Sequence, residues 1–146
     1  MGVQSDLILA RADAAEDIRA SDSPSAEWDG FSFKGMDNVK IAMLLSLLSS
    51  QSPSADFGKW LDAIPTVGDE VNGPWVFTLA DNAVDALAAI ASKEDEEFGT
   101  LAKSWGANKE FEGWEPDEVN ELLRSIGDLA ETATLEKKSM FLWVSL

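Results

Sequence analysis

Carboxylates are the side chains best able to do chemistry in this chain, and many of them fall in two runs. The first run is Glu94, Asp95, Glu96 and Glu97, and the second is Glu110, Glu112, Glu115, Asp117, Glu118 and Glu121. Such oxygen ligands can hold Mg²⁺ or Ca²⁺, and two carboxylates can act as the acid and base of a glycosidase-type reaction. Acids at the start of a helix also complement the helix dipole and need no further function. This last interpretation is the simplest.

Most other catalytic and metal-binding signatures are missing. The chain has no histidine and no cysteine, which removes the usual general base, the thiol nucleophile and the usual metal ligands. It also lacks the glycine-rich phosphate loops, the G-x-S-x-G motif and the calcium loop of EF-hands. We therefore expect no catalytic residue, no metal and no cofactor, and a carboxylate-based enzyme is the least favoured function.

The tryptophans form the second group of candidate functional residues. The chain has six tryptophans and no tyrosine. Four of them, Trp60, Trp75, Trp105 and Trp143, fall on predicted apolar stripes or strands and are expected in the core. Trp28 and Trp114 instead lie in expected loops beside glycine and acids. An exposed tryptophan there could stack a sugar or hold a cationic ligand, or it could anchor its loop over the edge of the core.

The overall charge narrows the range of partners. The formal net charge is −16, with 27 acids against 11 bases, and residues 61–146 carry 18 of the acids and six of the bases. Direct nucleic-acid binding needs a basic surface, and anionic membranes attract basic segments, so neither is expected. The charge favours a basic protein partner, although a large net charge also simply keeps a protein soluble.

The leading hypothesis is a non-enzymatic interaction module that docks a basic partner, as an immunity-type inhibitor or a mimic of nucleic-acid charge would. Its predicted partner-binding residues are Glu94, Asp95, Glu97, Glu110, Glu112, Glu115 and Glu118. The alternative is a protein that binds a small ligand, a sugar or a cationic metabolite, through Trp28 and Trp114. The oligomeric state is left open by the sequence.

The elements that must position these residues follow from hydrophobic periodicity. Strands are predicted over residues 3–10, 75–79 and 140–146. Helices are predicted over 13–20 and 37–49, from Pro53 through Ile64, from Asp81 through Ala91, around 98–105 and from Pro116 through Lys138. Residues 21–30 and 65–73 are predicted loops, rich in Ser, Asp, Pro and Gly.

These elements predict an α+β fold in a single domain, residues 1–146, which is the usual size of one domain. We expect a small sheet of three to four strands that includes both chain ends, packed with four to six helices. The last strand, MFLWVSL, is apolar on both faces, which indicates a middle strand or one covered on both sides. The helix over 37–49 is apolar nearly all round, which predicts a buried central helix.

Membrane insertion and secretion are not expected. The longest apolar stretch, residues 41–48, is far shorter than the roughly 20 residues of a spanning helix. The first ten residues lack the basic and apolar regions of a signal peptide. A cytoplasmic location is therefore expected.

Three segments resemble a known family. They are the start Met1-Gly2-Val3, the strand Gly73-Pro74-Trp75-Val76-Phe77 and the ending Leu142-Trp143-Val144-Ser145-Leu146. Together they resemble a group of small bacterial proteins, the YfbM-like family of unknown function. The resemblance implies a bacterial, cytosolic α+β domain, and it carries over no catalytic residue.

Overall fold

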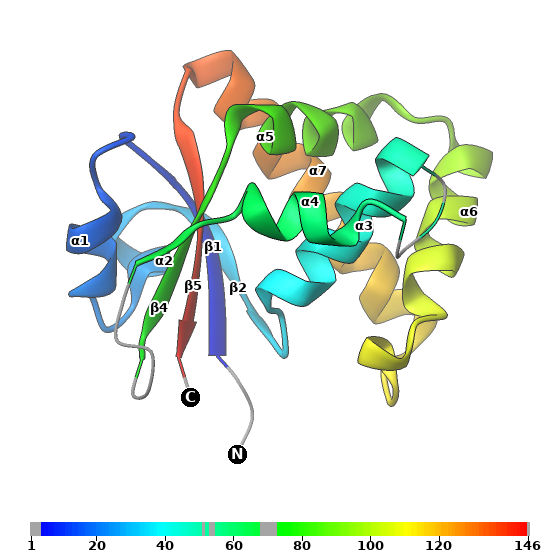
Figure 1. Cartoon of the computed structure of the whole chain (residues 1–146), viewed down its shortest axis with the longest axis horizontal. Coiled ribbons are helices and arrows are strands. Elements are labelled where there is room, and N and C mark those ends of the chain that lie inside the picture. The colour runs from blue at the N-terminus through cyan, green and yellow to red at the C-terminus, as the bar shows by residue number, and fades with distance from the viewer. Residues whose placement is uncertain (1–3, 51, 53–54, 68–72, 146) are drawn as a thin grey trace.

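The fold is built on one antiparallel sheet of five strands in the order β2-β1-β5-β4-β3 (Figure 1). The computed structural model describes residues 4–50, 52, 55–67 and 73–145. The strands are β1 (Gln4–Ala10), β2 (Asp29–Lys34), β3 (Thr66–Val67), β4 (Trp75–Leu79) and β5 (Ser139–Ser145). The predicted α+β class is confirmed, and the strands nearest the two chain ends, β1 and β5, pair with one another in the sheet.

Seven α-helices and two 3₁₀ turns complete the part of the chain that the structure describes. The helices are α1 (Ala15–Arg19), α2 (Pro24–Glu27), α3 (Asn38–Ser50), α4 (Phe57–Asp62), α5 (Asp81–Ala88), α6 (Asp95–Gly106) and α7 (Pro116–Glu136). The 3₁₀ turns are η1 (Ala89–Ser92) and η2 (Lys109–Phe111). No helix in these described stretches is long and apolar enough to cross a membrane.

Helices cover both faces of the sheet. The short helices α1 and α2 lie on one side, and α3 to α7 lie on the other (Figure 1). Side chains of β5 alternate between the two cores: Leu142 packs into the larger one and Phe141 and Trp143 into the smaller one. Because β5 is the third of five strands, its prediction as a middle strand covered on both sides is confirmed.

Two predicted loops contain secondary structure. The predicted loop 21–30 holds α2 and the start of β2, and the predicted loop 65–73 holds β3, although residues 68–72 lie outside the described part. A buried carboxylate explains the first correction. Asp6, only 1% exposed, accepts hydrogen bonds from the Ser25 backbone N–H at 2.9 Å and the Ser32 hydroxyl at 2.6 Å. It thereby ties α2 and β2 to β1.

The predicted central helix is confirmed. In α3, Ile41, Leu44 and Leu45 are completely buried. The helix begins where Asp37 accepts the backbone N–H of Lys40 on Oδ1 at 2.9 Å, which satisfies a donor that the first turn leaves free. This helix forms one wall of the groove described below.

The longest helix, α7, begins as predicted and ends earlier. Pro116 occupies its first turn, and Glu115 and Glu118 form a capping box. It ends at Glu136 because Lys137 adopts a left-handed conformation with φ of 56°, as C-terminal residues of helices often do. The prediction that Lys137 and Lys138 lie in the last turn is therefore wrong, since both follow the helix.

Candidate functional site

The helix α6 carries the first acidic run and lies at the end of the molecule far from the sheet (Figure 1). It forms because Phe98, Ala102 and Trp105 recur at helical spacing, and all three are buried against the main core. The indole N–H of Trp105 donates to the Lys40 carbonyl at 2.9 Å, which fixes α6 to α3. The remaining faces of α6 border two grooves.

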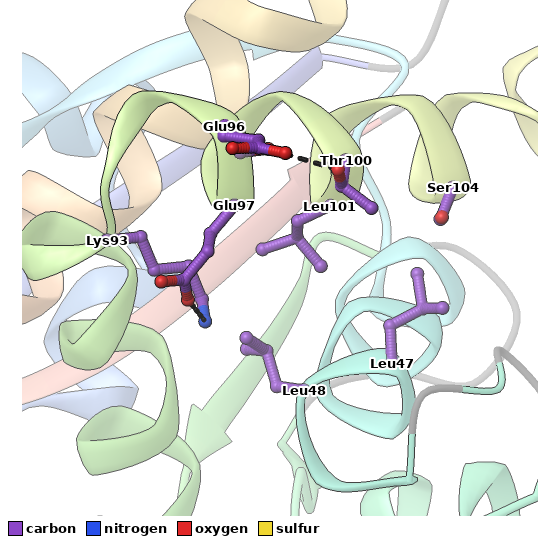
Figure 2. Close-up of a pocket in the computed structure, with 8 residues that line it drawn as sticks. All are labelled: Leu47, Leu48, Lys93, Glu96, Glu97, Thr100, Leu101 and Ser104. Atoms are coloured by element: carbon purple, nitrogen blue, oxygen red, sulfur yellow. Dashed lines mark hydrogen bonds and ion pairs between the residues drawn. The ribbon is translucent and has the colours of Figure 1, made fainter.

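The first groove lies between α3 and α6 and has a volume of about 510 Å³. This volume falls within the roughly 300–1,000 Å³ of ordinary ligand pockets. Leucines from both helices form its floor, and polar groups surround them (Figure 2). The lining residues are Leu47, Leu48, Lys93, Glu96, Glu97, Thr100, Leu101 and Ser104. We call this hollow the α3/α6 groove.

One ion pair lies within the α3/α6 groove. The Lys93 ammonium is 3.8 Å from Glu97 Oε2, and Figure 2 shows the two side chains pointing toward one another beside Leu48. The Lys93 side chain is 26% exposed and that of Glu97 is 63% exposed. The groove therefore combines an apolar floor with a carboxylate that is open to solvent.

The first acidic run is only partly in this groove. Glu94 is the N-cap of α6, and Asp95, Glu96 and Glu97 form its first turn. All four are exposed, but only Glu96 and Glu97 line the groove. Of the predicted partner-binding residues in this run, Glu97 thus lies at the groove, while Glu94 and Asp95 lie beside it.

The second acidic run lies at the other end of α6. Glu110 belongs to η2, and Glu112, Glu115 and Glu118 surround the start of α7. Eleven residue steps along α6 separate the two ends by roughly 16 Å. Two of these acids have a structural task, because Glu118 Oε1 accepts the backbone N–H of Glu115 at 3.1 Å. The two runs do not meet.

Trp114 borders a second groove, between α6 and α7, of about 500 Å³. Its wall is mainly apolar and is made by Gly99, Ala102, Lys103, Gly106, Ala107, Trp114, Pro116, Val119 and Asn120. The Trp114 ring stacks on Phe33 at 5.6 Å and meets Phe111 edge-on at 5.1 Å. Trp114 is therefore a half-buried loop anchor that also borders an open hollow.

A buried lysine lies behind this aromatic cluster. Lys40 is 5% exposed, and its ammonium lies 5.8 Å from the Trp114 ring and 5.4 Å from the Phe111 ring. Asp37 Oδ2 is 3.8 Å away. Ring faces attract cations, so Trp114 already faces a cation that the chain itself supplies.

Trp28 lines a smaller hollow of about 200 Å³ with Arg11, Asp13, Ala14 and Asp17. It packs against the smaller core and is half-buried. Arg11 Nη2 lies 2.7 Å from Asp13 Oδ2, and its hydrogen bond lowers the pKa of the Asp13 carboxyl below its ordinary value. Arg11 therefore already neutralises one of the two carboxylates that line the hollow around Trp28.

In the described stretches, no group of three or more Asp and Glu side chains is arranged so that it could hold a metal ion. No family model, curated protein or solved structure matches the chain. The resemblance to the YfbM-like family thus stays a prediction.

Sequence reasoning missed most of the α3/α6 groove. It assigned the helix over residues 37–49 to the core, and it gave no role to Lys93, Thr100 or Ser104. Two features of the sequence could have indicated the groove. The helix over residues 37–49 is apolar nearly all round, so part of its apolar surface can lie outside the core. Lys93 and Glu97 are four residues apart, a spacing that suits an ion pair on a helix.

Proposed function

We propose that the protein is a non-enzymatic interaction module that binds a basic protein partner through the α3/α6 groove. The observation that carries the proposal is the pairing of Leu48 and Leu101 in the floor with Glu96 and Glu97 on the rim. A surface of this kind suits a partner segment with both apolar and cationic side chains. Lys93 is the one cation among the lining residues, and Glu97 faces it.

The two parts of the groove would contribute differently to binding. Burying apolar side chains on leucines supplies most of the affinity, while carboxylates on the rim mainly accelerate encounter and select against acidic partners. The net charge of −16 extends this attraction over the whole molecule. An immunity-type inhibitor of a basic toxin, or a mimic of nucleic-acid charge, would be a concrete form of such a module.

The second acidic run has a supporting role in this proposal. Glu110 and Glu112 lie beyond the far end of α6, so they would attract a basic partner without touching the segment in the groove. Glu115 and Glu118 are needed for the capping box. We therefore place the main contact at Glu96 and Glu97 and assign long-range attraction to the acids near the start of α7.

The test is a titration of ¹⁵N-labelled protein with a synthetic amphipathic helical peptide of leucine and lysine, followed by NMR. We expect shifts concentrated at residues 47–48 and 93–104. The double variant Glu96→Gln and Glu97→Gln should bind about two- to thirtyfold more weakly, since two exposed ion pairs together contribute about 0.4–2 kcal/mol and 1.4 kcal/mol is tenfold.

A charge-matched double variant is the control. Asp128→Asn and Glu131→Gln remove two exposed charges from α7, away from both grooves, and should change the affinity less than twofold. If the two double variants weaken peptide binding equally, or if the NMR shifts are spread evenly over all acidic helices, the peptide responds only to the net charge of the protein. The groove would then not be the binding site.

A second candidate is supported by Trp114, which borders the groove between α6 and α7. A small ligand with an apolar or aromatic body would fit this mainly apolar hollow and could stack against the exposed part of the indole. In the same type of titration, such a ligand would shift residues 99–107 and 114–120 and leave Leu47 and Leu48 unchanged.

A further inference from the structure

The α3/α6 groove already contains a cationic side chain, that of Lys93. Its stem reaches into the groove from the turn η1–α6, and its ammonium lies in front of Glu97 (Figure 2). We infer that Lys93 is an internal substitute for a partner's cation, and that the partner segment is a basic amphipathic helix whose lysine or arginine replaces Lys93 at Glu97. This inference rests on the proposed function.

The geometry of the Lys93–Glu97 pair allows replacement. The 3.8 Å between Nζ and Oε2 exceeds the roughly 2.7–2.9 Å of a strong charge-assisted hydrogen bond. The Glu97 side chain is 63% exposed, so water screens the pair. A pair with one largely exposed partner and this separation contributes little stability, and Lys93 belongs to neither core cluster, so a cation delivered with apolar contacts can displace it without disturbing the core.

The Lys93 side chain also shows which chemistry the groove accepts. Only 26% of it is exposed, so its aliphatic stem is largely covered while its ammonium meets a carboxylate. Long cationic side chains pack in this way, with the stem on apolar surface and the charge outside. A lysine or arginine from a partner would find the same apolar wall and the same acceptor.

The shape of the groove favours a helix as the occupant. Its walls are two helices, α3 and α6, and ridges of a third helix can pack between them. Along α6, Glu97 and Leu101 follow one another by one helical turn, and Thr100 and Ser104 do the same beside them. A helix with a cation and an apolar residue one turn apart would match this order of carboxylate and leucine.

The test replaces Lys93 by methionine, which keeps most of the stem and removes the charge. We expect the leucine–lysine peptide to bind Lys93→Met about two- to fivefold more tightly, because Glu97 no longer has an internal partner worth about 0.2–1 kcal/mol. The control is Lys103→Met, which makes the same change on the opposite side of α6, in the other groove, and should alter the affinity less than twofold.

A double variant isolates the exchange at Glu97. In the background of Glu97→Gln, the replacement Lys93→Met should give no tightening, because the carboxylate to be freed is absent; such a cycle measures the coupling of the two residues. Tightening that persists in this background, or equal tightening by Lys103→Met, would overturn the inference and leave the proposed function intact. Absence of any NMR shift at the groove in wild type and Lys93→Met would overturn both.

Discussion

At the scale of single residues, Asp6 connects three elements of the fold, namely β1, α2 and β2. It is buried in β1 and accepts hydrogen bonds from α2 and β2. We predict that Asp6→Ala lowers the free energy of unfolding by about 1–3 kcal/mol, since it removes a buried carboxylate that accepts hydrogen bonds from Ser25 and Ser32. Chemical denaturation followed by circular dichroism measures this loss.

A nearby acid provides the comparison for Asp6. Asp22 is exposed in the turn before α2. Asp22→Ala should change the free energy of unfolding by no more than about 0.5 kcal/mol, as is usual for surface substitutions. Equal effects of the two replacements would mean that the bonds of Asp6 to Ser25 and Ser32 contribute nothing net to stability.

At the scale of elements, two helical glycines should respond in opposite ways to the same substitution. A Cβ on Gly127 of α7 would lie 2.9 Å from Ile90 Cγ2, whereas a Cβ on Gly99 of α6 would meet nothing within 4 Å. Gly→Ala inside a helix normally stabilises by up to about 1 kcal/mol. We expect this gain for Gly99→Ala, and a loss of about 1–3 kcal/mol for Gly127→Ala because it overpacks the contact with η1.

Urea denaturation of both alanine variants checks this pair of predictions. If Gly127→Ala stabilises the protein as Gly99→Ala does, then Ile90 moves aside easily and α7 and η1 are not tightly packed. Because Gly99 borders the groove next to Trp114 and not the α3/α6 groove, Gly99→Ala should leave binding of the leucine–lysine peptide unchanged.

At the scale of the whole molecule, the net charge of −16 opposes the compact state through self-repulsion. Raising NaCl from low concentration to about 0.15 M shortens the Debye length to roughly 8 Å. We therefore predict a rise of Tm by a few degrees that levels off at moderate salt; about 1 kcal/mol corresponds to roughly 2–4 °C in a chain of this size. Differential scanning calorimetry measures it.

The control for the salt effect is a less acidic protein. Replacing Asp128 and Glu131 by lysine changes exposed positions of α7 and should reduce the salt dependence of Tm. A Tm that rises linearly up to molar salt, equally in both proteins, would indicate exclusion of salt from the surface and not screening of the acids.

The elements with strong local signals could be predicted from the sequence, and those made by distant contacts could not. Trp75–Leu79 has the predicted bounds, and α3 is the predicted central helix. The strand β2 was missed although Phe31 and Phe33 alternate with polar residues, because its pairing with β1 and the Ser32–Asp6 hydrogen bond join residues 20 or more positions apart. Local sequence patterns do not indicate contacts between residues so far apart in the chain.

The candidate site shows the same division. The acids of residues 94–97 were predicted on the surface, and they are exposed at the start of α6. The groove that gives two of them a partner surface exists only because Leu47 and Leu48 come to lie beside Leu101, more than 50 positions later in the chain. The two acidic runs lie at opposite ends of α6, and this separation likewise could not be predicted from local patterns.

The neighbouring positions of β1 and β5 have a mechanical consequence. The two strands are antiparallel, and Gln4 pairs with Ser145 at the start of one and the end of the other. A force that pulls these two positions apart loads the ladder from one end, so that the residue pairs open in succession and do not resist together. The sheet that joins both ends of the fold would thus unzip under tension, although the same pairing is protected on both faces by helices.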